Sequence, residues 1–203
     1  MKDIIIDADF LNMLLNRDER DNPKAIFKQL MEELEYRPFL VEYVAKCELY
    51  DNKCAQELIN EGYITVLHYD EILTDSEKIS FESLVWDFAD EQAKEDFERP
   101  YKSIFSEGFR FAGHNLGEII SEMIALRTNM IYFASNDKGA KALAKRHFNR
   151  VDYTLEVKNL AEVLSELNPS DSSFLWKDIK LMLKDARWKN EKDMLRDKWI
   201  NKM

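Results

Sequence analysis

Apolar residues along this chain alternate between short continuous runs and helical spacing. Ile4–Ile6 form a β-branched run bounded by acids, which is typical of a strand buried on both faces. Strands are also predicted at 63–69, 130–134 and 151–155. Helices are predicted at 10–15, from Asn22-Pro23 to about 36–38, and at 54–60, 115–127, 138–148 and 160–167, while residues 39–50 fit either element. The repeated strand, helix, strand order predicts an α/β fold with a mostly parallel sheet.

The pattern changes after residue 169. Residues 170–203 predict amphipathic, basic helices, with Ser170 or Asp171 available as the first N-cap. A chain of 203 residues, of which 45% are hydrophobic, can bury one full core. We therefore expect one domain over residues 1–169, with an acidic helical insertion at about 70–114, followed by a C-terminal helical extension.

Three tryptophans stand out in the extension. Trp176, Trp188 and Trp199 are expected to bury against the domain or against a second subunit in a homodimer. No apolar run reaches the ~18 residues that a membrane span needs, and the N-terminus reads as a core strand, so we expect a cytoplasmic protein without a membrane partner. Cys47 and Cys54 have neither a zinc-binding nor a disulfide spacing and are expected to be reduced.

Charged residues are unevenly distributed along the chain. The net charge of −10 argues against a surface that binds nucleic acid throughout, because phosphate binding needs clustered lysine and arginine. Residues 70–99 hold eleven acids and three bases, whereas residues 138–150 hold five bases and no acid. One helical face of the basic stretch carries Lys138, Lys141 and Lys145, with Arg146 beside them. Such a face is commonly only solvated, and the alternative is a patch that guides phosphate groups.

Acidic residues stand where predicted strands end and where a helix begins. Asp7 follows the first strand and Asp137 follows the strand at 130–134, so both are expected at the carboxyl edge of the sheet, where parallel α/β folds bind ligands. Glu118, in the first turn of its helix, can reach the same place. Carboxylates this close repel one another unless compensated, and Mg²⁺ or Mn²⁺ is the natural compensation. Such an ion can activate water for attack on a phosphodiester.

Each of these acids also has a simpler interpretation. Asp7, Asp9 and Asp137 stand where helix N-caps are expected, and for Asp137 capping is compatible with metal binding. Glu118 in a first turn would complement the helix dipole. Glu122, one turn further on, would ordinarily be a solvated partner for a lysine. The metal hypothesis therefore depends on the separated segments acting together.

Three segments carry the most specific pattern. They are Ile4-Ile5-Ile6-Asp7-Ala8-Asp9, Asn115-Leu116-Gly117-Glu118-Ile119-Ile120-Ser121-Glu122 and Ser135-Asn136-Asp137-Lys138-Gly139-Ala140-Lys141. In this order they resemble the first-strand Asp, the Gly-Glu helix start and the Ser/Thr-x-Asp turn of the PIN domain family, the metal-dependent nucleases that include bacterial toxin ribonucleases of the VapC type. The resemblance covers about residues 3–157 and implies a three-layer α/β/α fold.

The resemblance also implies a set of site residues. Asp7, Glu118 and Asp137 would be catalytic. The implied ligands of Mg²⁺ or Mn²⁺ are Asp7, Glu48, Glu118 and Asp137, with Asp9 and Glu122 as additional candidates. The candidate substrate-binding residues are Ser135, Asn136, Lys138, Lys141, Lys145 and Arg146. Glu48 is the best match to the family's acid-plus-Leu pair, with Glu42 as its competitor, and Ser135 would position Asp137 or a water molecule at the metal.

The function implied is hydrolysis of RNA, with an antitoxin-type protein as a candidate partner. A PIN-like module that binds RNA or protein without catalysis is the alternative, because segment 70–114 is longer and more acidic than a minimal domain needs. Asp9 stands where the family usually has a small hydroxyl or amide residue, which suggests an additional ligand. Asp7-Ala8-Asp9 also suggests a phosphatase of the haloacid dehalogenase type, but Leu11 replaces that family's Thr or Val.

Overall fold

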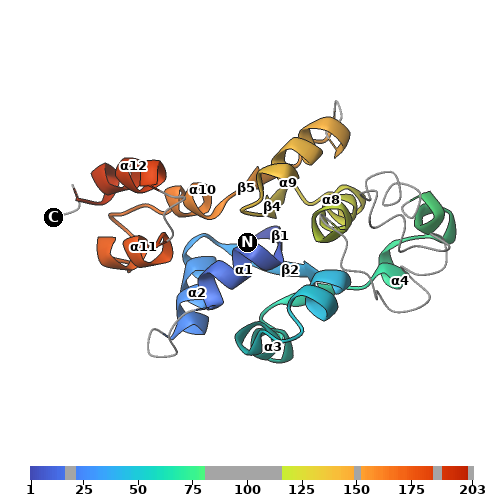
Figure 1. Cartoon of the computed structure of the whole chain (residues 1–203), viewed down its shortest axis with the longest axis horizontal. Helices are drawn as coiled ribbons and strands as arrows, with labels where there is room; N and C mark the ends of the chain where they lie inside the picture. Colours follow the sequence, from blue (N-terminus) through green and yellow to red (C-terminus); the bar gives the residue numbers. More distant parts are fainter. Residues whose placement is uncertain (17–21, 81–115, 149–151, 185–188, 201–203) are drawn as a thin grey trace.

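A sheet of five parallel strands lies at the centre of the computed structural model (Figure 1). The structure describes residues 1–16, 22–80, 116–148, 152–184 and 189–200, and the strands and helices are those of these ranges. The strands are β1 (Lys2–Ile6), β2 (Tyr36–Val41), β3 (Thr65–Leu67), β4 (Tyr132–Ala134) and β5 (Glu156–Lys158). Their order across the sheet is β3-β2-β1-β4-β5, and all four pairings are parallel.

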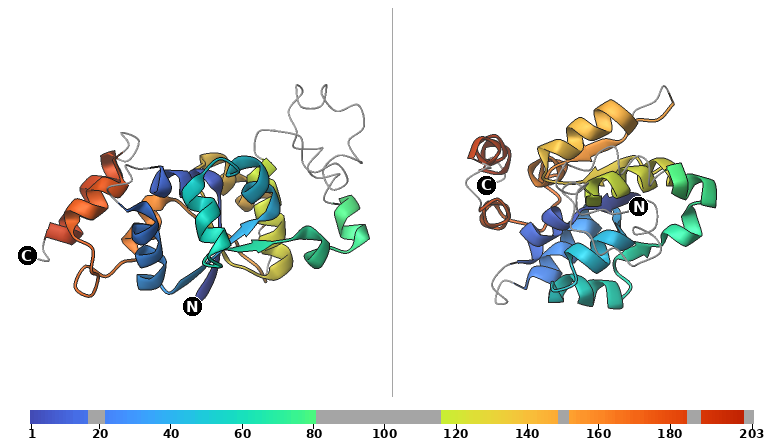
Figure 2. Two further views of the ribbon diagram at one scale, coloured as in Figure 1. Left: turned by 90° about the horizontal axis from the view of Figure 1, so that it is seen from below. Right: turned by 45° about the vertical axis from the view of Figure 1, so that its right-hand side comes forward.

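Helices cover both faces of this sheet (Figure 2). Before β4 they are α1 (Ala8–Leu15), α2 (Pro23–Glu33), the π-helix η2 (Val44–Glu48), α3 (Lys53–Asn60), α4 (Tyr69–Ile72) and α8 (Leu116–Thr128). After β4 they are α9 (Lys138–Leu143), the π-helix η3 (Ala144–Phe148), α10 (Leu160–Ser165), α11 (Trp176–Met182) and α12 (Lys189–Ile200). Helices α1, α2 and α3 contact one another, whereas α8 packs on β1, β2 and β4 and contacts α9. The predicted α/β class with a parallel sheet is confirmed.

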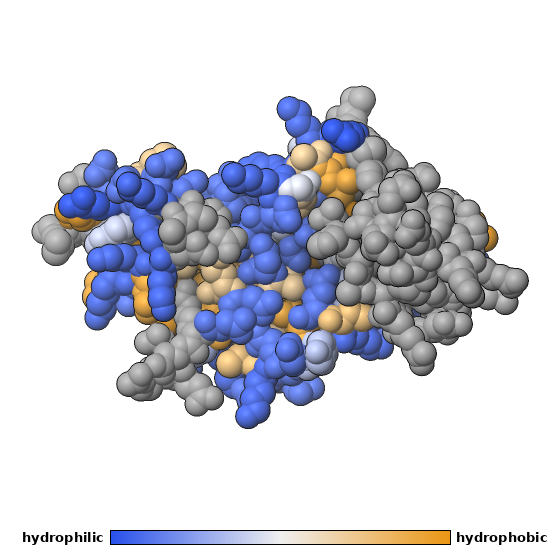
Figure 3. Space-filling view, in the orientation of Figure 1, coloured by the Kyte–Doolittle hydropathy of each residue, from blue (hydrophilic) through white to orange (hydrophobic). Residues whose placement is uncertain are grey.

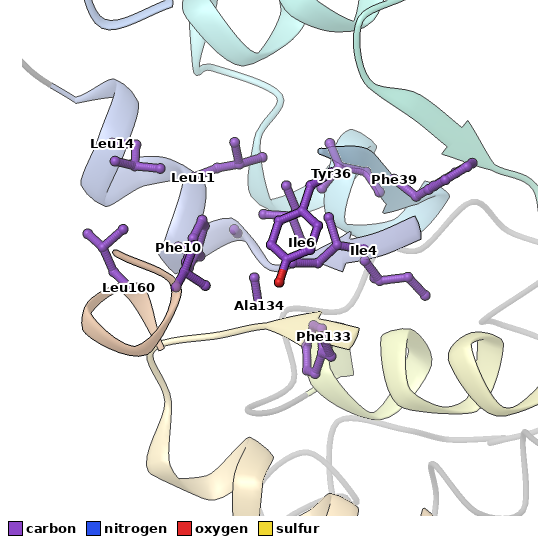
Figure 4. Packing of buried hydrophobic residues seen from close by; sticks show 14 of the residues in the cluster. Ile4, Ile6, Phe10, Leu11, Leu14, Tyr36, Phe39, Phe133, Ala134 and Leu160 are labelled. Carbon is purple, nitrogen blue, oxygen red and sulfur yellow. The ribbon is translucent and has the colours of Figure 1, made fainter. Parts of the chain in front are cut away.

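The core forms around β1, the middle strand. Its three isoleucines are fully buried, because a strand with neighbours on both edges and helices on both faces has no contact with water. Figure 4 shows Phe10 of α1 beside Leu160 of α10, whereas Phe133 of β4 lies next to α8. Elsewhere hydrophilic residues cover most of the described surface in the view of Figure 3. The predicted strand buried on both faces is therefore confirmed, and the structure adds that it is the middle strand of the sheet.

Strand β2 differs from the prediction. The helix expected to end near residues 36–38 ends at Glu33, and Tyr36 begins a strand that passes through Pro38. Glu35 between them adopts a left-handed conformation with φ of 55°. Proline is rare inside sheets because it lacks the amide donor. It is tolerated here because β3 pairs only with the three residues that follow it, 39–41.

Two other strand predictions need correction. The strand predicted at 151–155 is wrong, because β5 is Glu156–Lys158. Its lysine is buried: Lys158 Nζ lies 2.7 Å from Glu166 Oε1 and 3.9 Å from the centre of the Tyr132 ring, and these contacts replace hydration. The strand predicted at 63–69 is shorter than expected and spans only 65–67.

The C-terminal helices share the main core. Leu195 and Trp199 of α12 are buried in the same apolar cluster as β1, and Trp176 packs against it. Lys198 Nζ donates hydrogen bonds to the carbonyl oxygens of Ser165, the last residue of α10, and of Leu167 just beyond it. These contacts tie the extension to the end of the sheet domain.

The first helix of the extension starts later than predicted. It begins at Trp176, with Leu175 as the N-cap, because Asp178 accepts the amide of Leu175 at 2.8 Å. The predictions for residues 81–115 and for Trp188 lie outside the described ranges. Within those ranges, no helix has the length and apolar character that a membrane crossing requires.

Replacing Trp199 by alanine is expected to lower the free energy of unfolding by about 3 kcal/mol, because the indole is almost fully buried between α12 and the core. Met194 on the same helix is 70% exposed, so Met194→Ala should change stability by no more than about 0.5 kcal/mol. Urea denaturation of both variants measures the difference. Equal effects would show that α12 does not dock as described.

Candidate active site

The acidic residues gather where the strand order reverses. Chain connections run from β1 toward β2 and β3 on one side, and the chain then returns to place β4 on the other side of β1. In parallel α/β sheets the carboxyl ends of such neighbouring strands flank a crevice in which ligands bind. Ile6 and Ala134 pair at the ends of β1 and β4. Asp7 follows the first of these strands and Ser135 the second, so the fold itself brings them together.

Ser135 joins the two acids at this point. Its Oγ donates a hydrogen bond to Asp7 Oδ2 at 2.8 Å and accepts one from the amide of Asp137 at 3.1 Å. Asp7 Oδ1 accepts the amide of Ala8 at 2.5 Å, and Asp137 Oδ1 accepts that of Gly139 at 2.5 Å. Both aspartates are therefore helix N-caps. Ser135 also links them through its two hydrogen bonds, because it contacts the Asp7 carboxylate and the backbone of Asp137 at once.

Asp9 and Asn136 form a second connection. Asp9 lies in the first turn of α1, and its Oδ1 accepts the amide of Asn136 at 3.1 Å. Asp7 is the N-cap of that helix, so the capping interpretation of Asp9 is wrong. The side-chain oxygen of Asn136 accepts the amide of Leu160 at 2.9 Å. The predicted substrate-binding residue Asn136 thus holds the turn after β4 against α10.

Glu48 reaches the site from the π-helix η2, and its place depends on Gly117. The amide of Gly117 donates a hydrogen bond to the Glu48 carboxylate. A Cβ atom at residue 117 would lie 2.5 Å from Glu48 Oε1 and 2.9 Å from Oε2, which is closer than packing permits. The competing acid, Glu42, instead contacts Lys46 and His68. Gly117 therefore contributes to the site because it has no side chain, which lets Glu48 approach the backbone. A glycine at the start of a helix is only a weak sequence signal for such a role.

The acids of these segments raise one another's pKa values. Burial raises the pKa of Asp7 well above its usual value, the charges of Glu118, Asp9 and Glu48 raise it further, and the Ser135 hydrogen bond opposes them. Burial, followed by Glu118 and Asp9, raises the pKa of Glu48 to about 7. The cluster therefore retains protons near neutral pH when no cation compensates it.

Glu118 lies at the centre of this network. Burial raises its pKa, its own amide opposes that shift, and the charges of Asp137 and Asp9 add to it. Its helix α8 packs against β1, β2 and β4, and Gly117 in its first turn approaches Glu48 of η2, which places this turn among the other acids. The structure thus brings Asp7, Asp9, Glu48, Glu118 and Asp137 into one electrostatically coupled cluster.

Glu122 differs most from its expected environment. The solvated interpretation is wrong, because the residue is fully buried and both carboxylate oxygens lack a hydrogen-bond partner among the described residues. Burial, followed by the charge of Glu118, raises its pKa to about 9. Helix α8 is covered on almost all sides, so a polar position within its apolar sequence does not face water. The apolar residues Ile119, Ile120 and Ile124 around it are the sequence feature that indicates burial of this helix.

The side chains do not form a closed metal-binding group. Among the residues described, no three His, Cys, Asp or Glu side chains are arranged to hold a metal ion. Carboxylates repel one another when no cation lies between them, which favours separated rotamers.

Four predicted phosphate-guiding residues follow Asp137, and two of them line a groove beside β5. All four predicted phosphate-guiding side chains, Lys138, Lys141, Lys145 and Arg146, are exposed. Lys141 Nζ lies 2.6 Å from Glu162 Oε1, and with Lys145 it lines a groove beside β5 that none of the clustered acids lines. The basic face is therefore directed in part toward the sheet edge.

Comparisons with known proteins add no identification. No protein-family model, curated protein sequence or solved structure matches this chain. The class that fold and site define is an α/β protein with an acidic cluster at the switch point of a parallel sheet.

Replacing Glu122 by glutamine is expected to stabilise the metal-free protein at alkaline pH. The folded state holds the Glu122 proton until about pH 9, whereas the ordinary value is 4.5, so the wild-type stability from this group falls as pH rises between those values. The glutamine variant should be more stable by more than ~1 kcal/mol at pH 8 and equal at pH 4.5. Thermal unfolding across pH measures this, with exposed Glu71→Gln as the control. A difference independent of pH would contradict the assignment.

Replacing Gly117 by alanine tests the approach of Glu48. Alanine normally stabilises a helix by ~1 kcal/mol relative to glycine, but here the added methyl group displaces the carboxylate and should lower stability by ~1 kcal/mol or more. In a Glu48→Ala background the clash is absent, and the same change should become stabilising. Urea denaturation of the four proteins gives the coupling. An unchanged sign in the double variant would refute the contact.

Proposed function

We propose that this chain is a metal-dependent nuclease of the PIN type that hydrolyses phosphodiester bonds in RNA. The observation that carries the proposal is the coupled cluster of Asp7, Asp9, Glu48, Glu118 and Asp137 at the carboxyl ends of β1 and β4. The motifs with which the chain resembles PIN domains supply four of these five acids. Their convergence from four separated segments is what a shared ligand requires.

The donor set fits a hard divalent cation. Carboxylate oxygens are the ligands that Mg²⁺ and Mn²⁺ prefer, and a cation would offset the repulsion that raises the pKa values of Asp7, Glu48 and Glu118. One turn after Glu118, the two carboxylate oxygens of buried Glu122 have no hydrogen-bond partner among the described residues, so this group could also serve as a ligand. When bound, such an ion would supply Lewis-acid polarisation and would activate water.

The chain's own residues have distinct roles in this proposal. Asp7, Glu118 and Asp137 would hold the ion, with Glu48 completing the set and Asp9 close by. Ser135 would fix the Asp7 carboxylate and the backbone of Asp137 through its two hydrogen bonds. Exposed Lys138, next to Asp137, would supply the positive charge that keeps a polyanion near an acidic pocket.

A PIN-like module that binds RNA or protein without catalysis is the second candidate. It is favoured by one observation, the absence among described residues of three acids already arranged around a metal position. Calorimetric titration with Mn²⁺ separates the candidates. Binding that disappears in Glu118→Gln supports the nuclease, and no heat of binding supports the module.

Replacing Asp137 by asparagine is expected to reduce Mn²⁺-dependent cleavage of single-stranded RNA at least ~100-fold, because a charged ligand is lost. Asparagine is as good an N-cap as aspartate, so α9 should keep its stability. The matched control is Asp152→Asn, because Asp152 is exposed and precedes β5, away from the carboxyl ends of the strands, so this variant should retain full activity. A gel assay with labelled RNA, with and without EDTA, measures cleavage. Cleavage that persists in EDTA and in Asp137→Asn would rule out the proposed function.

A further inference from the structure

Within the part of the chain that the structure describes, no strand pairs with the outer edge of β5. This strand is the last in the order β3-β2-β1-β4-β5. The amide of Glu156 donates to the carbonyl of Ile131 at 2.7 Å, and the carbonyl of Lys158 accepts the amide of Ser135 at 3.1 Å. Because alternate residues of a parallel strand direct their backbone groups to opposite sides, the N–H and C=O of Val157 point away from β4. The edge thus offers a donor and an acceptor to a further strand.

A groove of about 780 Å³ runs along this edge. Helices α9 and α10 flank β5 in Figure 1. Val157 pairs with Phe133 and faces the α8 and α9 side of the sheet, whereas Lys158 faces Glu166 at the end of α10. Ion pairing between Lys141 and Glu162 joins the two walls. The open backbone edge is therefore recessed between two helices that lie on opposite faces of the sheet.

The charges of the groove are balanced in number and separated in space. Its charged lining residues are Lys141, Lys145, Lys158, Glu156, Glu162 and Glu166. Two lysine–glutamate pairs are satisfied at 2.6 and 2.7 Å. Lys145, on the α9–η3 wall, has no ion pair among the described residues, and Glu156, on the α10 side, is 58% exposed and only 3.6 Å from Lys158. One wall therefore offers an uncompensated positive charge and the other a negative charge.

These features select one kind of occupant. A nucleic acid would find no net positive charge in the groove, because three carboxylates balance its three lysines, and this disfavours phosphate binding. The edge strand of a second copy is itself recessed between α9 and α10, so two such edges cannot meet without collision of the helices. An extended peptide is narrow enough, pairs with the backbone of Val157 and directs alternate side chains to the two walls.

We propose that the β5 groove binds an extended peptide as an added strand, with acidic side chains toward Lys145 on the α9–η3 wall and basic side chains toward Glu156 on the α10 side. Ile131, which is 47% exposed, and Val157 add apolar contact at the floor. This site is separate from the acidic cluster, and the proposal holds whether or not the chain is a nuclease.

The test uses the full chain and a display library of random peptides of about eight residues. Panning on the wild type, with parallel panning on Val157→Pro, is expected to enrich sequences that alternate acidic and basic residues only on the wild type. Proline removes the outward N–H and leaves the ladder to β4 intact, whereas Val157→Ala shortens the side chain and keeps the donor. Thermal unfolding confirms that both variants fold.

Fluorescence anisotropy with the most enriched synthetic peptide provides the measurement. Val157→Pro should weaken binding at least ~tenfold and Val157→Ala less than about threefold, because backbone pairing supplies the affinity. Lys145→Glu should weaken the same peptide and should bind its counterpart in which lysines replace the acids. The proposal is overturned if no peptide is enriched over Val157→Pro, or if both variants bind equally. It is also overturned if a twelve-nucleotide oligouridylate displaces the peptide in a Lys145-dependent manner.

Discussion

The hydrogen bond from Ser135 to Asp7 is the interaction on which the candidate site depends. It joins the ends of β1 and β4, buries a carboxylate that is costly to bury, and aligns the next acid along the chain through the amide of Asp137. Burial and the charges of Glu118, Asp9 and Glu48 raise the pKa of Asp7, and the hydrogen bond from Ser135 offsets only part of that shift. Acids held together against their own repulsion are commonly functional, because stability alone gives no reason to keep them.

Much of this arrangement could be predicted from the sequence. An isoleucine run bounded by acids predicts a strand buried on both faces, and a second apolar run before Ser135 and Asp137 predicts another buried strand. Parallel topology then requires that residues following both strands meet at one edge, which is why Asp7 and Asp137 could be placed from the sequence alone. The role of Asp9 could not be predicted in this way. Its charge raises the pKa values of its neighbours, and its carboxylate accepts a hydrogen bond from the turn after β4, a contact between distant segments.

Other features depend on tertiary contacts that local patterns do not contain. Pro38 stands in an interior strand because its neighbour β3 is short, and Lys158 lies in β5 because Glu166 and Tyr132 receive its charge. Glu122 reads as solvated by helical periodicity, yet α8 is enclosed on nearly every side. In each case a polar or helix-breaking residue is tolerated through a partner distant in sequence. Local sequence preferences therefore predict the wrong element or environment for such residues. The same residues depend most strongly on contacts with distant parts of the chain.

The separation between the two halves of the site has a consequence for how the chain folds. Asp7 and Ser135 are 128 residues apart, whereas β2, the other neighbour of β1, is much closer to β1 in sequence. Closing the long loop to β4 costs entropy that only the later contacts repay. During synthesis the acids of the first half are therefore exposed to water, without their serine partner, until β4 has emerged. Whatever chemistry the cluster performs therefore requires that the chain has been synthesised beyond Asp137.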